Sequence, residues 1–328
     1  AAEALGQIGA KDAAAAVGAL AAEYIKHPAV TAMGPDDETW PAPPEAEAFK
    51  LALFALVRLG AYDALASAVL DGDRPVSNWW PVAYALQRIG DPRAAPALMQ
   101  LARGQGKYTV AFAARGLGAS KNSAAGDILL PLLDPKRPPE VIVSATRAVA
   151  QLGVTAAVDP LIALVIDPAT DANVRLEAVT ALGTLRAEPA LTLVQDLMTD
   201  SWPAMRIAAM RAAAAIDPDT FRIVLATLED DSHWSVRAAL AGLLATMPSE
   251  VALDRVRAMT NDPDKRVWPA AMRALGRLKA PDAEALILER VKDPDFAVRA
   301  AAAELIGSMK PATGPAALRQ AYEAGLPD

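Results

Sequence analysis

The 328-residue chain has no cysteine, only two histidines and few aromatic residues, and each shortage excludes a class of function. Without cysteine there is no disulfide frame, no thiolate nucleophile and no Cys-ligated metal. His27 and His233 lie far apart in the chain, and neither is followed by glutamate, so no histidine cluster has metal-ligand spacing. No glycine-rich phosphate loop and no nucleophile elbow occurs. We therefore expect a protein that is not an enzyme and that holds no metal and no cofactor.

Positive charge and long apolar runs are also scarce. The formal net charge is −7 and the pI is about 5.1. This balance weighs against general nucleic-acid binding, whose affinity comes mainly from neutralising phosphates. No apolar run reaches the roughly 18 residues of a membrane span. We expect no nucleic-acid partner, no membrane partner and a soluble chain, and the composition leaves cytoplasm and periplasm equally open.

What the chain has instead is alanine and a period. Hydrophobic residues make up 53% and aromatic residues 5%, and the difference is largely alanine, the best helix former. Arg175, Arg206, Arg237 and Arg299 recur at a spacing of 31 residues or twice that, and Trp268 occupies the missing position. Self-similarity at such a period is typical of a stacked repeat protein, which grows by adding layers to one elongated core.

Apolar residues at helical spacing, interrupted by Asp-Pro or Gly, predict two helices per repeat, which we name A and B. The predicted B helices cover residues 1–9, 45–60, 75–90, 107–121, 139–153, 171–186, 202–216, 233–247, 264–279 and 295–310. The predicted A helices cover residues 11–25, 62–71, 93–104, 123–133, 155–166, 188–199, 218–229, 249–260, 281–292 and 312–324.

One motif, D-P-x-x-x-V-R-x-x-A-x-x-A-L-G, runs from each turn into the following B helix. One copy is carried by Asp293-Pro294, Val298-Arg299, Ala302 and Ile306-Gly307, and another by Val174-Arg175, Ala178 and Ala181-Leu182-Gly183. The motif resembles the short bacterial HEAT-like repeat that is also found in phycobilisome lyase subunits. The resemblance implies an all-α, armadillo-like fold, an α-α superhelix (right-handed α-solenoid) of about ten helical pairs.

We interpret residues 1–328 as a single repeat domain. The first residues match the end of a repeat, so we expect a piece of a longer protein that is truncated at both ends. Residues 27–44 interrupt the repeats with five prolines and an acidic cluster, Asp36-Asp37-Glu38. Connections this long are functional or disordered. Either this segment is disordered or a mere insertion, or it folds back to gate or extend a binding site.

A row of aspartates keeps the same period as the row of arginines. Asp167, Asp262 and Asp293 stand in the turns that precede B helices, where aspartate can cap the free N–H groups of the helix. Because the two periods stay in register, we predict an Arg–Asp ladder along the seam between repeats. It comprises Arg175, Arg206, Arg237, Arg299, Asp167, Asp262 and Asp293. The alternative is a set of solvated charges that contribute little individually.

The N-terminal half departs from this rule. Its arginine position holds Phe49, Trp79, Val110 and Ile142, and aromatic residues cluster nearby. We expect Trp80, Tyr84 and Phe112 to face the groove lined by B helices, and we expect these three residues and Trp79 to anchor a partner. The alternative is that the rings fill gaps in an alanine-rich core.

Six residues after the apolar start of several B helices stands an arginine. These residues are Arg115, Arg147, Arg211 and Arg273, with Thr180, Gly242 and Glu304 at the same position in other repeats. They predict a discontinuous basic stripe on the concave face, suited to an acidic peptide or protein surface. The alternative is an exposed helix face that happens to carry arginine.

These observations favour a non-catalytic scaffold that binds a protein or peptide along its concave B-helix face. A second hypothesis is the non-catalytic arm of a larger enzyme, because similar arrays are joined to cyclophilin-type prolyl isomerases or serve as chromophore lyase subunits. One HEAT-like class acts as DNA glycosylases, but the acidic pI counts against that activity here. A designed repeat is disfavoured by the irregular segment 27–44.

Overall fold

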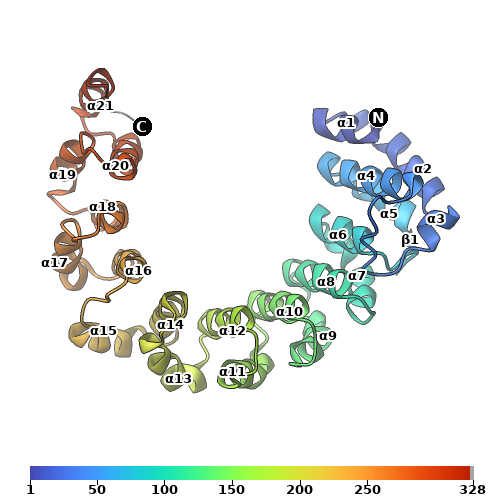
Figure 1. The fold of residues 1–328 in the computed structure, drawn as a ribbon, viewed down its shortest axis with the longest axis horizontal. Helices are drawn as coiled ribbons and strands as arrows, with labels where there is room; N and C mark the ends of the chain where they lie inside the picture. Colours follow the sequence, from blue (N-terminus) through green and yellow to red (C-terminus); the bar gives the residue numbers. More distant parts are fainter. Residues whose placement is uncertain (326–328) are drawn as a thin grey trace. The chain divides into compact units, whose positions relative to one another are not determined.

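The computed structural model describes residues 1–325 and consists almost entirely of paired helices. The chain divides into two compact units, Ala1–Ala190 (unit 1) and Leu191–Asp328 (unit 2). Within each unit, an A helix packs behind its B helix, and each B helix contacts the B helix of the next repeat (Figure 1). This confirms the predicted all-α fold of stacked helical pairs.

Unit 1 contains six B helices and five A helices. The B helices are α1 (Ala2–Ile8), α4 (Pro44–Leu59), α6 (Trp80–Ile89), α8 (Lys107–Ala119), α10 (Pro139–Leu152) and α12 (Ala172–Thr184). The A helices are α2 (Ala14–Tyr24), α5 (Tyr62–Val69), α7 (Ala95–Ala102), α9 (Gly126–Leu129) and α11 (Val158–Ile166). Outside the pairs lie α3 (Pro28–Thr31) and a hairpin of β1 (Leu70–Asp71) and β2 (Arg74–Pro75).

Unit 2 continues the same alternation within residues 191–325. Its B helices are α14 (Pro203–Ile216), α16 (Trp234–Leu244), α18 (Trp268–Arg277) and α20 (Phe296–Met309). Its A helices are α13 (Leu191–Asp196), α15 (Pro218–Thr227), α17 (Ser249–Met259), α19 (Ala283–Arg290) and α21 (Gly314–Glu323). Short 3₁₀ turns lie at helix ends in both units: η1 (Lys11–Ala13), η2 (Pro92–Ala94), η3 (Ser123–Ala125), η4 (Leu130–Leu133), η5 (Thr155–Ala157), η6 (Glu188–Ala190), η7 (Leu197–Thr199) and η8 (Lys265–Val267).

The helix ends follow from local chemistry. B helices α4, α6 and α10 have proline in their first turn, where its missing N–H removes no helical hydrogen bond. The same three helices end at glycines with left-handed φ, at Gly60, Gly90 and Gly153. The predicted start of α6 at residue 75 is wrong. The hairpin, in which Leu70 pairs with Pro75, occupies residues 70–75, and the helix begins only at Trp80.

Small residues let neighbouring B helices approach closely. A Cβ atom at Gly118 of α8 would lie 2.7 Å from the Cα atom of Ala148 in α10. The core between these layers is therefore built largely from alanine, leucine and valine, as the composition predicts.

The turn aspartates fold their own turns and do not cap the B helices. The carboxylate of each turn aspartate accepts a hydrogen bond, at 2.7–2.9 Å, from the backbone N–H two residues further on. These aspartates are Asp134, Asp167, Asp200, Asp231, Asp262 and Asp293. The turns are Asx turns, which mimic a backbone turn. The predicted capping by Asp167, Asp262 and Asp293 is therefore wrong, because the N–H that each binds lies in the turn before the helix.

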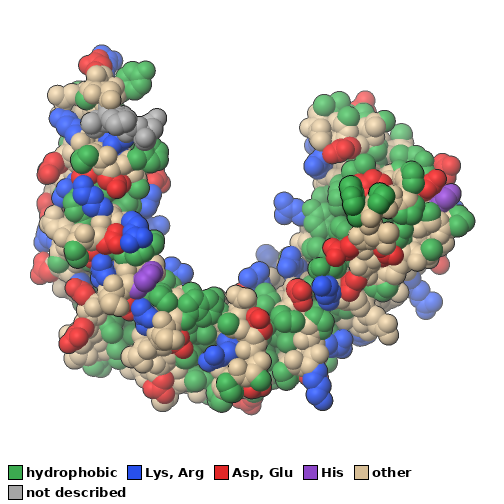
Figure 2. Space-filling view, in the orientation of Figure 1, with side chains coloured by type: hydrophobic (Ala, Val, Ile, Leu, Met, Phe, Trp, Pro, Cys, Tyr) green, Lys and Arg blue, Asp and Glu red, His purple; other side chains and the backbone are tan. Residues whose placement is uncertain are grey.

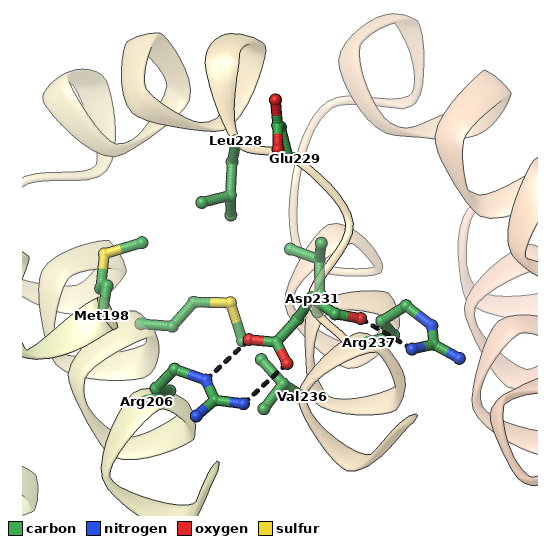
Figure 3. Close-up of a pocket in the computed structure, with 9 residues that line it drawn as sticks. Met198, Arg206, Leu228, Glu229, Asp231, Val236 and Arg237 are labelled. Carbon is green, nitrogen blue, oxygen red and sulfur yellow. Dashed lines mark hydrogen bonds and ion pairs between the residues drawn. The ribbon is translucent and has the colours of Figure 1, made fainter. Parts of the chain in front are cut away.

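The Arg–Asp ladder forms in unit 2 between consecutive turns. Arg206 donates from Nε and Nη2 to the two carboxylate oxygens of Asp231, at 2.7 and 2.8 Å (Figure 3). Arg237 binds Asp262 in the same forked manner, at 2.6 and 2.7 Å. The Nη1 atom of Arg237 also donates to the backbone carbonyl of Asp231 at 2.7 Å. Each arginine thus joins the turn of its own repeat to the turn of the next.

Within unit 2, the residue at the ladder position keeps one hydrogen bond to a backbone carbonyl even where the residue type changes. Arg206, Arg237, Trp268 and Arg299 each donate to the carbonyl of the turn aspartate six residues earlier. Arg175 differs, since its Nε atom donates to the carbonyl of Val165 at 3.0 Å. Trp268 therefore fulfils the backbone part of the arginine's role without its charge.

Two aspartates that were predicted to belong to the ladder, Asp167 and Asp293, do not pair with any of its arginines. The arginine that pairs with a turn aspartate stands 25 residues before it. That position is Ile142 for Asp167 and Trp268 for Asp293. Among the described residues, the Asp167 carboxylate consequently makes only the hydrogen bond of its Asx turn, whereas the Asp293 carboxylate pairs with Lys265 at 2.8 Å and with Arg290 at 3.7 Å.

Burial makes the Arg237–Asp262 pair costly to break. The Asp262 side chain is 6% exposed, and its hydrogen bonds from Arg237 hold the pKa of this carboxyl below its usual value. We predict that Arg237→Met lowers the free energy of unfolding by about 2–3 kcal/mol, because a nearly buried carboxylate loses its cation. Arg222→Met breaks an exposed pair with Asp219 in the same unit and should cost less than about 0.5 kcal/mol. Urea denaturation measures both, and equal losses would contradict the ladder.

The lowered pKa of Asp262 also gives a pH dependence. A carboxyl whose folded pKa lies below its unfolded value of about 3.9 stabilises the protein above that value. That stabilisation disappears as the pH falls through the folded pKa. The difference in unfolding free energy between wild type and Asp262→Asn should therefore be full at pH 6 and shrink below about pH 4. A difference that stays constant down to the acid limit of folding would rule this linkage out.

Candidate functional site

Six rings form a continuous row through α4, α6, α8 and the loop before α6. We call it the aromatic row, and in order of contact it comprises Phe49, Trp79, Trp80, Phe112, Tyr84 and Phe54. Neighbouring ring centroids are 5.1–6.4 Å apart, and three of the five contacts are edge-to-face. Such pairs stabilise beyond the area they bury. The row therefore links three successive B helices.

The two ends of the row differ in exposure. Phe49 is fully buried and Trp79 is 3% exposed. Trp80, Tyr84, Phe112 and Phe54 are half-buried. Of the four predicted anchors, Trp79 is therefore a core residue, because it stacks on Phe49 and its indole donates to the carbonyl of Asp37. The other three present ring surface to solvent, as expected.

Arginines border the half-buried rings on the B-helix face of unit 1. This face is the side of its B helices that points away from its A helices. The guanidinium of Arg115 lies 5.5 Å from the ring centre of Phe112, and its Nε donates to Ser144 at 3.2 Å. Arg147 is paired with Glu177 at 2.6 Å, so its charge is largely neutralised. The predicted basic stripe is thus weaker at Arg147 than the sequence indicates.

Two further arginines of this face were missed by the sequence analysis. Arg58 and Arg88 are exposed in the last turns of α4 and α6. Neither lies within ion-pair distance of a carboxylate in residues 1–325. Each stands four residues after Phe54 or Tyr84, on the same side of its helix, and that spacing was the available signal. Lys and Arg side chains project along the edge formed by α6, α8 and α10 (Figure 2).

Arg211 and Arg273 lie in unit 2 and are exposed. Arg273 pairs with Glu304 at 2.8 Å, and these two residues occupy the same position in successive repeats. The structure therefore does not combine the four predicted arginines into one unpaired basic surface.

The segment 27–44 is not free. After α3, its residues 35–37 lie against the N-terminal ends of α6 and α8 and hydrogen-bond to Trp79, Trp80 and Thr109. Three residues later the Trp40 side chain is 84% exposed. The described residues thus support the fold-back alternative, since the segment contacts the aromatic row.

Cavities formed by the described residues occur in both units. The cavity between α14 and α16 has a volume of about 30 Å³ and is lined by Met198, Met210 and the Arg206–Asp231 pair (Figure 3). It accommodates little more than one water. Two shallow grooves on unit 1 lie at A helices, one between η4 and α11 and one between α2 and α5. Among the described residues, no group of three or more His, Cys, Asp or Glu could hold a metal ion.

None of the helices within residues 1–325 has the length and apolar character needed to cross a bilayer.

Family models match most of the repeats. The HEAT repeats model matches residues 126–215, 221–307 and 258–326, and the PBS lyase HEAT-like repeat model matches residues 82–104. No curated protein matches the chain.

Several solved structures are similar to the chain at low identity. Human deoxyhypusine hydroxylase in complex with glycerol is 19% identical, with a TM-score of 0.31, over 75% of this chain and 94% of that one. The complex of CpcE and CpcF of phycocyanin lyase from Nostoc sp. PCC7120 is 19% identical, with a TM-score of 0.39, over 70% of this chain and 88% of that one. An engineered protein is 18% identical, with a TM-score of 0.40, over 94% of this chain and 99% of that one. At these TM-scores the similarities carry no information about activity.

Burial distinguishes Trp79, which the segment contacts, from Trp40, which belongs to the segment. We predict that Trp79→Ala lowers the free energy of unfolding by about 3–4 kcal/mol, because it leaves a large cavity beside Phe49. Trp40→Ala, at the 84% exposed ring, should change it by less than about 0.5 kcal/mol. Thermal and urea denaturation of both variants decide the matter. A small loss for Trp79→Ala would mean that this ring is not part of the core.

Proposed function

The chain belongs to the HEAT-repeat family, and we propose that it is a non-catalytic scaffold that binds a protein or peptide on the B-helix face of unit 1. The observation that carries the proposal is the combination of half-buried rings with unpaired arginines on that face. Tyr84 and Phe112 provide ring surface, while Arg58 and Arg88 provide exposed charge without a neighbouring carboxylate.

Two physical arguments support this face as a binding surface. Aromatic and arginine side chains are the residues most often responsible for binding energy at protein interfaces. The rings are held by ring contacts on both sides, so a partner would order few side chains on binding. A rigid aromatic centre with a charged border has the composition of an interface.

The charge of the face indicates the chemistry of its partner. The chain as a whole carries a net charge of −7, yet Arg58, Arg88 and Arg115 are exposed on three successive B helices, α4, α6 and α8. Among the acidic residues of the unit 1 B helices, Glu47 is paired with Lys50 and Glu177 with Arg147. A partner segment with carboxylates beside apolar side chains would complement this surface.

The same face would serve if the chain is the non-catalytic arm of a larger enzyme. The match of residues 82–104, which include most of α6 and α7, to the PBS lyase HEAT-like repeat supports this second candidate. In either case the contribution of this chain is recognition of a partner protein.

A peptide display library selected on the wild-type chain provides a defined probe. We predict that the selected peptides are enriched in aspartate and glutamate beside aromatic or aliphatic residues. The double variant Arg58→Glu/Arg88→Glu should bind them about tenfold or more weakly, because two favourable charges become repulsive.

Arg103→Glu makes the same kind of charge change at the end of A helix α7, away from this face, and should leave the affinity unchanged. Fluorescence anisotropy at two salt concentrations measures all three proteins. Peptides that bind wild type and the double variant equally would refute the proposed face.

A further inference from the structure

A carboxylate from one part of the chain lies at the N-terminal end of a helix from another part. The Asp36 carboxylate accepts hydrogen bonds from the backbone N–H groups of Lys107 and Tyr108, the first two residues of α8. The free N–H groups and the helix dipole favour a negative charge at this position. The contact spans about 70 residues of sequence and therefore fixes the segment to α8, the fourth B helix of unit 1.

Gly106 makes the close approach possible. It has φ +92°, and a Cβ atom there would lie 2.6 Å from the Cβ atom of Pro35 and 2.7 Å from Oδ1 of Asp36. A side chain at this position would therefore collide with the segment and would also strain the backbone. The residue before α8 is thus adapted to the presence of residues 35 and 36.

Two backbone carbonyls of the same turn receive the remaining bonds. The Pro35 carbonyl accepts from the backbone N–H of Trp80 at 2.8 Å and from the Thr109 hydroxyl at 2.9 Å. The Asp37 carbonyl accepts from the indole N–H of Trp79 at 2.9 Å and of Trp80 at 3.1 Å. Both indoles of the aromatic row are thus satisfied by one oxygen atom of the segment.

We propose that Pro35-Asp36-Asp37 is an internal ligand, an acidic clasp bound at the ends of α6 and α8, and that it orders the aromatic row for partner binding. The second half of this proposal rests on the proposed function of the B-helix face. Trp80, held by the clasp, contacts Phe112 at a centroid distance of 6.1 Å, and Phe112 contacts Tyr84 at 5.3 Å. Release of the clasp would free Trp80 and loosen the rings that the face presents.

Hydrogen exchange of the indole N–H groups, followed by NMR, tests the first half without any partner. In wild type, the Trp79 and Trp80 indoles should be protected, and the 84% exposed Trp40 indole provides the unprotected reference. Asp36→Ala removes the acceptor for two N–H groups of α8 and should accelerate exchange at Trp79 and Trp80 by about tenfold or more.

Three controls make the result specific. Glu38→Ala removes a neighbouring exposed carboxylate and should leave both indoles protected. The Trp268 indole N–H, which donates to the backbone carbonyl of Asp262 in unit 2, should exchange at the same rate in every variant. Asp36→Asn keeps the shape of the side chain and should accelerate the same two indoles to a smaller extent, which covers the case that Asp36→Ala does not fold. Unchanged exchange at Trp79 and Trp80 in a folded Asp36 variant would overturn the clasp.

The second half is tested with the display-selected peptides. Asp36→Ala should weaken their binding about tenfold, whereas Glu38→Ala should not, because only the former disorders the row. If exchange accelerates but the affinity stays at the wild-type value, the clasp orders the indoles without preparing the face, and this half of the proposal fails. That result differs from failure of the proposed function, in which the Arg58→Glu/Arg88→Glu variant would bind like wild type.

Discussion

Every helical pair of a repeat stack can bury its apolar side only against its neighbours, so the seam between repeats must be filled layer by layer. The two units fill the ladder position of this seam differently. In unit 2, Arg206 and Arg237 join consecutive turns through forked ion pairs. In unit 1, Phe49 and Trp79 hold the equivalent positions and stack on each other within the core. These two buried rings form the inner end of the aromatic row, whose half-buried members are Trp80, Phe112, Tyr84 and Phe54.

The repeat could be predicted from the sequence because its causes are local. Proline in first turns, glycine in left-handed turns and apolar residues at helical spacing placed most B-helix ends within a few residues. The Arg–Asp pairs were predictable because both rows share a period. Their register was not, since only the folded turns show that the arginine precedes its aspartate by 25 residues. That offset explains why Asp167 and Asp293 lack arginine partners from the ladder.

The candidate site was only partly predictable, because it depends on contacts between distant segments. Tyr84 and Phe112 follow from helical spacing, and Arg58 and Arg88 lie one turn after Phe54 and Tyr84. The burial of Trp79 does not follow, because this residue precedes its helix and is covered by residues about 40 positions earlier. No local pattern could indicate that Asp36 binds the end of α8. The composition of segment 27–44 suggested an insertion, whereas its hydrogen bonds attach it to α6 and α8.

The structure thus joins three features on unit 1: a stack of small-residue helices, a row of rings and an acidic segment bound at its edge. The central claim is that partners bind the B-helix face of unit 1 at α4, α6 and α8. Hydrogen-exchange mass spectrometry of the full chain, with and without a saturating display-selected peptide, tests it most directly. Added protection should be confined to α4, α6, α8 and residues 33–41. Protection of the A helices α2, α5 and α7 instead would contradict it.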